Sequence, residues 1–272
     1  MPGLEGSLAR LYAQAKRGDG GFTCEPIRDL TKIHLGTEFS LVVAVDSDGG
    51  IGSRANDLVK VPEYVLGRFA VRVPLMEILS CGAIPIAAFD MLTVPMDELG
   101  KEIIRGVRDE LADAGLGADF PLSGSAEDNV PTTATGVATT IIGLVHEDDF
   151  RPGRSTESDT VLCIGVPKSA PRDEVSLDDR EIVRPEHIRS ALALENVQDV
   201  LPVGSRGVWY EARQMAKSAD LAFSRSSTVS IDGDKSAGPS TCALVSVRGD
   251  ATRSVAAAVD VPVFQIGAMI QR

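Results

Sequence analysis

The chain has 272 residues, of which 43% are hydrophobic and 24% are charged, the composition of a globular protein with enough apolar material for a core. Its formal net charge is −12. Binding to nucleic acid or to an anionic membrane surface needs basic residues. The charge therefore argues against both kinds of partner, and we expect a small-molecule ligand.

The cysteines and the N-terminal segment bear on the cellular compartment. The four cysteines are far apart and form no C-x-x-C motif, so neither structural zinc nor disulfides are implied. Residues 1–19 lack the apolar central run of a signal peptide, and no segment is long enough to span a bilayer. The sequence thus predicts a cytoplasmic protein.

In the first half of the chain, a helix is expected over 4–16, then a polar loop over 24–36 and a buried strand over 41–45. The strand runs into an acidic, glycine-rich turn that begins at Asp46. Glycine allows positive φ and close backbone approach, and a carboxylate at a strand end can hold a cation. After Pro62 the apolar spacing predicts a helix, broken only by Glu77, and then a strand over 85–92.

The second half begins with an amphipathic helix within 92–116, a polar loop and a buried strand over 137–145. The polar connection over 146–159 predicts a domain boundary, which gives domains 1–150 and 151–272. The second domain is expected to contain strands over 159–167, 197–202 and 261–270, a strand before Val247, and helices over 185–194 and 251–258. Residues 201–223 should form a strand, a turn and a helix.

Two motifs, AVDSDGGIG and MEILSCGAIP, resemble the N-terminal half of the aminoimidazole ribonucleotide synthetase (PurM-like) superfamily. There, a strand ends in an acidic turn and a helix ends in a D-I-x-x-x-G-A-x-P pattern. Glu77 stands where the family usually has aspartate. The resemblance implies an α/β (α+β) fold of two domains, with an N-terminal mixed sheet covered by helices on one face and a smaller α+β C-terminal domain. It also implies a homodimer with shared sheets.

The same resemblance implies a site for ATP and Mg²⁺ that uses carboxylates instead of a P-loop. Carboxylates repel a triphosphate, so a hard cation has to bridge the two. Ser125 replaces the usual acid after a glycine. Either Glu127 or Asp128 then takes the metal, or the site uses fewer carboxylates, and the position of Glu127 puts it first. The expected metal ligands are Asp29, Asp46, Glu77 and Glu127, and the expected nucleotide-binding residues are these four with Gly49, Gly50 and Gly52.

Three basic residues are candidates for the phosphoryl-transfer step. Lys32 and Lys60 could reach phosphate, and Arg206 lies in a small-residue turn before a helix, where anions bind. Each of them could equally be a solvated surface charge.

The sequence therefore predicts ATP-dependent phosphoryl transfer to a small, nucleoside-like acceptor. The variant motifs DSDGGIG, VKVP and KSAGP are most similar to the α-ribazole kinase subgroup, which acts in salvage of the cobalamin lower ligand. Enzymes like selenophosphate synthetase, for which Cys24 would be the reactive residue, thiamine-phosphate kinase or aminoimidazole ribonucleotide synthetase remain alternatives. A non-catalytic nucleotide-binding homologue is another, because the motifs depart from the family at Glu77, Ser125 and Arg206.

Overall fold

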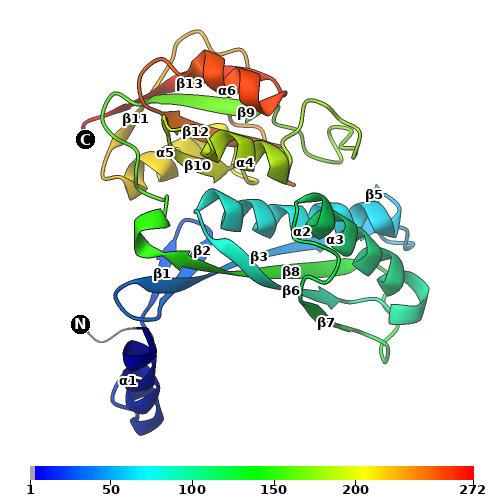
Figure 1. Cartoon of the computed structure of the whole chain (residues 1–272). Coiled ribbons are helices and arrows are strands. Elements are labelled where there is room, and N and C mark those ends of the chain that lie inside the picture. Colours follow the sequence, from blue (N-terminus) through cyan, green and yellow to red (C-terminus); the bar gives the residue numbers. More distant parts are fainter. Residues whose placement is uncertain (1–3) are drawn as a thin grey trace.

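Two β-sheets with their helices form the part of the chain that the computed structural model describes, residues 4–272 (Figure 1). The first sheet has six strands in the order β1-β2-β3-β8-β6-β7, and the second has five in the order β10-β12-β9-β13-β11. The strands of the first sheet are β1 (Cys24–Ile27), β2 (Leu30–His34), β3 (Phe39–Gly49), β6 (Ile84–Leu92), β7 (Leu122–Ala126) and β8 (Gly136–His146).

The remaining elements complete a two-domain α+β fold, as predicted. The second sheet comprises β9 (Thr160–Gly165), β10 (Val197–Pro202), β11 (Ala222–Arg225), β12 (Cys242–Val247) and β13 (Val263–Ile270), and β4 (Ile51–Gly52) pairs with β5 (Val59–Lys60). The helices are α1 (Leu4–Arg17), α2 (Glu63–Ser80), α3 (Lys101–Asp113), α4 (Pro185–Leu192), α5 (Val208–Ser218) and α6 (Thr252–Val259). No helix in this described part is long and apolar enough to cross a membrane.

The centre of the first sheet is the antiparallel pair β3 and β8, which runs from Phe39 opposite His146 to Gly49 opposite Gly136. Burial alternates along both strands, as expected of a sheet with one covered face. Helices α2 and α3 cover that face, and α1 lies on the other side (Figure 1). Strand β7 joins β6 in parallel, so the prediction of a mixed sheet with helices on one face is confirmed.

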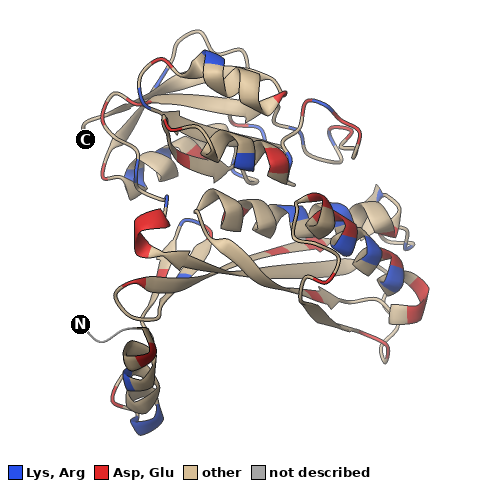
Figure 2. Cartoon of the chain, in the orientation of Figure 1, with Lys and Arg blue, Asp and Glu red and all other residues tan. Residues whose placement is uncertain are grey.

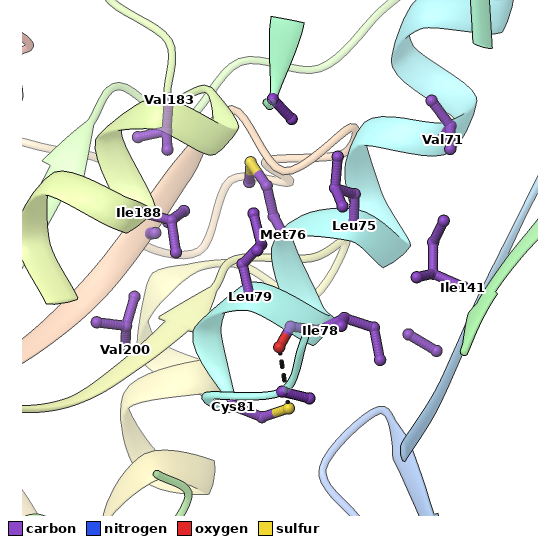
Figure 3. Close-up of a cluster of buried hydrophobic side chains, with 14 of the residues drawn as sticks. Val71, Leu75, Met76, Ile78, Leu79, Cys81, Ile141, Val183, Ile188 and Val200 are labelled. Carbon is purple, nitrogen blue, oxygen red and sulfur yellow. Dashed lines mark hydrogen bonds between the residues drawn. The ribbon is translucent and has the colours of Figure 1, made fainter. Parts of the chain in front are cut away.

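Helix α2 is apolar almost all round because it is buried on two sides. Figure 3 shows Ile78 turned toward Ile141 of β8, while Leu79 lies toward Ile188 of α4 and Val200 of β10. The two domains therefore share one hydrophobic cluster, with α2 between them. This shared burial holds the domain orientation.

Helices α2 and α3 cross at two glycines. A Cβ on Gly67 would overlap the carbonyl oxygen of Ile103, and one on Gly106 would overlap that of Tyr64. Only glycine permits this approach at either position. Basic and acidic residues alternate along the outer side of α3, the solvated face that its sequence predicts (Figure 2).

Pro74 lies inside α2 and has no N–H to donate to the carbonyl of Ala70, one turn earlier. The hydroxyl of Thr139, on β8, donates to that carbonyl instead, with an oxygen–oxygen distance of 2.6 Å. The sheet thus satisfies a backbone group that the helix leaves free, two turns before Glu77.

Three segments differ from the expectation. Strand β3 continues through the predicted turn to Gly49, because Asp46 to Gly49 pair with β8. The expected loop over 24–36 contains β1 and β2, and the expected loop before β8 contains β7. These three strands contain polar residues and show no apolar run, and pairing with a neighbour makes them strands.

The second sheet has helices on both faces. The alternate residues Ala243 and Val245 of β12 face the cluster shared with α2, α4 and α6, and Leu244 faces the one formed with α5. Most predicted strands and helices of this domain are present, within two residues at their ends. The exception is the segment 201–223, where the helix ends at Ser218 and the unpredicted strand β11 begins at Ala222. The chain passes between the sheets after β8, and a boundary at residue 150 stays a prediction.

Candidate functional site

A cavity of about 610 Å³ lies where the two domains meet. The first domain contributes acidic residues and an apolar stretch of α2 that includes Phe69. The second contributes loops rich in serine and glycine. A volume of this size accommodates a drug-sized ligand. The charged side chains on the cavity wall are Asp29, Asp46, Asp48 and Glu77.

Strand β3 supplies two of these carboxylates. Alternate residues of a strand point to the same face, so Asp46 and Asp48 continue the face of Val42 and Ala44, which is covered by α2. Ser47, between them, belongs to the outer face. Extension of β3 past its predicted end is what brings both aspartates under the helix.

Asp29 and Glu77 reach the cavity from two other elements. Asp29 occupies the tight turn between β1 and β2, after Arg28, which has a left-handed φ of 56°. The Arg28 guanidinium makes a two-pronged ion pair with Asp199 of β10. This pair fixes the turn against the second domain. Glu77 extends from the last turns of α2 and is 8% exposed.

The carboxylates oppose one another's ionisation. Burial, and then repulsion from Asp46, raise the pKa of Asp48 to about 7. Burial also raises the pKa of Asp46, with a further contribution from Asp29. The pKa of Glu77 lies well above its ordinary value because of burial, then Asp29 and Glu211. A divalent cation would relieve this repulsion without protonation.

Two members of this acidic group were not predicted. Asp48 was part of the quoted motif but was assigned to a turn. Glu211 is buried on α5, and burial followed by repulsion from Asp29 raises its pKa to about 7. An acid in the otherwise apolar face of α5 was the available signal, and it is the same signal that singled out Glu77.

Glu127 lies apart from the other three predicted metal ligands. It lines a second groove of about 470 Å³, which shares only Ser47 and Asp48 with the large cavity. Its carboxylate accepts hydrogen bonds from the backbone N–H groups of Asn129 and Val130, at 2.6 and 3.0 Å. These bonds hold its pKa below the ordinary value. Asp29, Asp46 and Glu77 are therefore brought together, and Glu127 is not.

The three basic residues predicted to act in phosphoryl transfer do not line the cavity. Lys32 pairs with Glu147 at 2.6 Å. Lys60 donates to the backbone carbonyl of Arg54. Arg206 lies over the ring of Tyr210 and donates to its hydroxyl at 2.7 Å. Each base has an intramolecular partner, so a role in phosphoryl transfer remains a prediction that would require movement.

The predicted glycines do not line the cavity, although their neighbours Asp48 and Ile51 do. Gly50 and Gly52 have φ of 72° and 145°, which favour glycine, and Gly49 ends β3. The Asp57 carboxylate holds this loop by accepting bonds from the N–H of Thr135 at 2.7 Å and from its hydroxyl at 2.8 Å. From this loop, Ile51 lines the cavity.

Oxygen donors of this kind suit Mg²⁺. Between residues 4 and 272, no three His, Cys, Asp or Glu side chains form a ready metal-binding group. Mg²⁺, however, commonly takes only one or two protein carboxylates and completes its coordination with water and phosphate oxygens. Asp46 and its neighbours Asp29 and Asp48 fit that mode, in which the nucleotide and the metal arrive together.

Comparison with known proteins finds one family model that matches part of the chain and solved structures with a similar fold. Residues 29–145 match the model for the AIR synthase related protein, N-terminal domain. No curated protein matches the sequence.

Among solved structures, E. coli HypE, a hydrogenase maturation protein, aligns with a TM-score of 0.62 and 16% identity, over 85% of this chain and 80% of that one. The thiamine-monophosphate kinase of Stenotrophomonas maltophilia K279a aligns with a TM-score of 0.60 and 15% identity, over 98% and 94%. T. maritima PurL, described as complexed with ATP, aligns with a TM-score of 0.62 and 14% identity, over 93% of this chain but 43% of PurL.

At these identities the structural matches establish a shared fold, and the sequence match adds the family of the N-terminal domain. The resemblance to the AIR synthase related, PurM-like superfamily is therefore confirmed in sequence over residues 29–145 and in fold over most of the chain.

Proposed function

We propose that this protein is an ATP-dependent phosphoryl transferase that uses Mg²⁺ and acts on a small molecule. The observation that carries the proposal is the convergence of Asp29, Asp46 and Glu77 on one cavity between the domains. Proteins of the same fold include a kinase and an enzyme described in complex with ATP, which supports the class of reaction.

In the proposed reaction, a hydroxyl oxygen of the acceptor bonds to the γ-phosphorus of ATP. The bond from that phosphorus to the β,γ-bridging oxygen breaks, ADP leaves with the electron pair, and the hydroxyl proton passes to solvent. Mg²⁺ would be held by Asp46 with Asp29 or Asp48, and would supply the positive charge that phosphoryl transfer requires. Glu77 would be a further ligand of the metal, and the apolar face of α2 would exclude water from the bound phosphates.

Titration calorimetry with ATP in the presence of Mg²⁺ tests this proposal. We expect the wild-type protein to bind ATP only when Mg²⁺ is present, and Asp46→Asn to lose binding while keeping its fold by circular dichroism. Asp250→Asn removes an exposed carboxylate outside the cavity and should bind like the wild type. Unchanged binding by Asp46→Asn would exclude Asp46 from the site.

The acceptor we put first is α-ribazole, because the motifs DSDGGIG, VKVP and KSAGP are most similar to those of that subgroup. A selenophosphate synthetase-like reaction is disfavoured, since Cys24 is exposed on the edge strand β1 and does not line the cavity. Release of ADP in the presence of α-ribazole, measured against thiamine monophosphate, would separate the kinase candidates.

One observation favours a second candidate, a protein that binds nucleotide without catalysis. Lys32, Lys60 and Arg206 are all turned to partners outside the cavity. Tight binding of ATP and Mg²⁺ with no transfer to any acceptor would support this candidate over the kinase.

We also propose a homodimer formed through the uncovered face of the first sheet. Large apolar side chains are exposed on that face, with Val45 65%, Ile84 70%, Ile86 42% and Met91 40% exposed. Apolar patches of this kind mark association surfaces. Light scattering should report a dimer for the wild type and a monomer for the double variant Val45→Glu, Ile84→Glu. A wild-type monomer at micromolar concentration would refute the dimer.

A further inference from the structure

The wall of the cavity formed by the second domain is uncharged. It consists of four serines with glycine, alanine, proline and valine from three separate loops. Among the described residues that line the whole cavity, there is no lysine, arginine or histidine. The serines are Ser169, Ser205, Ser236 and Ser240. This wall can exchange hydrogen bonds with a ligand and cannot neutralise a charge on it.

Two lysines lie next to these serines in the sequence, and both are occupied elsewhere. The ammonium of Lys168 pairs with Asp179 and with Glu181, each at 2.7 Å. That of Lys235 pairs with Asp173 at 2.7 Å. The same Asp173 carboxylate accepts a bond from the N–H of Ser169 at 2.8 Å. The ion pairs therefore brace the serine loops and hold both lysines away from the wall. Arg206, which follows Ser205, lies over the ring of Tyr210 and does not line the cavity.

We propose that the serine wall selects an uncharged, hydroxyl-bearing acceptor of nucleoside size and rejects the corresponding phosphate monoester. A monoester would bring its own negative charge into a cavity that holds Asp29, Asp46, Asp48 and Glu77, without a basic side chain to meet it. Mg²⁺ would offset part of the carboxylate charge, but the ATP bound with it adds more negative charge than the metal removes. At a separation of about 4 Å and an effective dielectric constant of about 20, repulsion from one uncompensated charge lowers affinity by more than tenfold. The apolar side chains of α2, such as Phe69 and Val73, offer a flat surface to an uncharged ring.

This inference rests on the proposed function. Pairs of ligands that differ only in a phosphate group distinguish failure of the inference from failure of the proposed function. Calorimetry first establishes binding of Mg²⁺ with the non-hydrolysable analogue AMPPNP. Failure there refutes the proposed function. The loaded protein is then titrated with α-ribazole, adenosine, uridine and thymidine, each beside its 5′-monophosphate. We expect at least one uncharged member to bind, and each that binds to do so at least tenfold more tightly than its monophosphate. Tighter binding of any monophosphate, or binding of no uncharged member, overturns the selectivity while leaving the nucleotide site in place.

A charge placed on the wall gives an independent test. Ser205 is exposed and lines the cavity, so Ser205→Lys adds a cation without disturbing the core. We expect this variant to gain at least tenfold in affinity for the monophosphates relative to the uncharged members. Ser227→Lys adds the same charge at an exposed position outside the cavity and should leave the preference unchanged. An equal shift in both variants, or none in Ser205→Lys, overturns the assignment of the wall.

Discussion

The ion pair between Arg28 and Asp199 joins the two domains beside the cavity and can be tested by substitution. The guanidinium donates through both terminal nitrogens to the two carboxylate oxygens, and also to Ser218 at 2.7 Å. The side chains are 4% and 0% exposed. Arg28→Met removes the charge and keeps a Cβ, so the cost of the left-handed backbone is the same in both proteins.

Removing one partner leaves a buried charge without its counter-ion, which costs about 3–5 kcal/mol. In Arg28→Met the Asp199 carboxylate would retain only the N–H of Gly153, at 3.3 Å. The expected loss is a large share of the roughly 5–15 kcal/mol that stabilises an ordinary domain. Replacing both partners, as in Arg28→Met with Asp199→Leu, removes the unpaired charge and should recover most of the loss.

Urea denaturation of Arg28→Met, Asp199→Leu and the double variant measures these changes in the free energy of unfolding. Arg248→Met alters an exposed arginine that donates to Gln198, and should change stability by less than about 0.5 kcal/mol. Because Arg28 positions the turn that carries Asp29, its loss should also weaken binding of ATP with Mg²⁺. Single variants that each cost less than about 1 kcal/mol would show that the pair does not fix the domains.

Three further substitutions test the packing of the first domain around the site. Burial raises the pKa of Asp90 from 3.8 to about 6, so ionisation of this carboxyl destabilises the folded protein at neutral pH. Asp90→Asn should therefore stabilise the protein by about 2–3 kcal/mol at pH 7. Thermal melts should show this gain disappear as the pH falls from 6 to 4, and no gain at pH 7 would contradict the shift. Thr139→Val leaves the Ala70 carbonyl unpaired and should cost about 1–3 kcal/mol in urea, whereas an unchanged midpoint would mean that α2 does not need this bond. Gly106→Ala gains about 1 kcal/mol in helix propensity but overlaps the Tyr64 carbonyl, and a net stabilisation would contradict the close crossing of α2 and α3.

The sequence predicted the segment that organises the site, because its signals are local. The apolar run before Asp46 and the helical spacing after Pro62 identified β3 and α2, and the lone acid at Glu77 stood out in an apolar helix. The same motifs carried the family resemblance, which the match over residues 29–145 confirms. Asp29 was placed by its position relative to that family, and it does line the cavity.

Only the tertiary structure showed which acids share the cavity. Asp48 joins Asp46 because pairing with β8 extends β3 beyond its apolar run. The packing of the second domain brings Glu211 close enough to raise the pKa of Glu77, although Glu211 does not line the cavity. Glu127 separates from the group because it follows β7 into the neighbouring groove. Residue spacing encodes the face that each element buries. The distance between side chains on different elements depends on strand order and domain packing, which no local pattern in the chain contains.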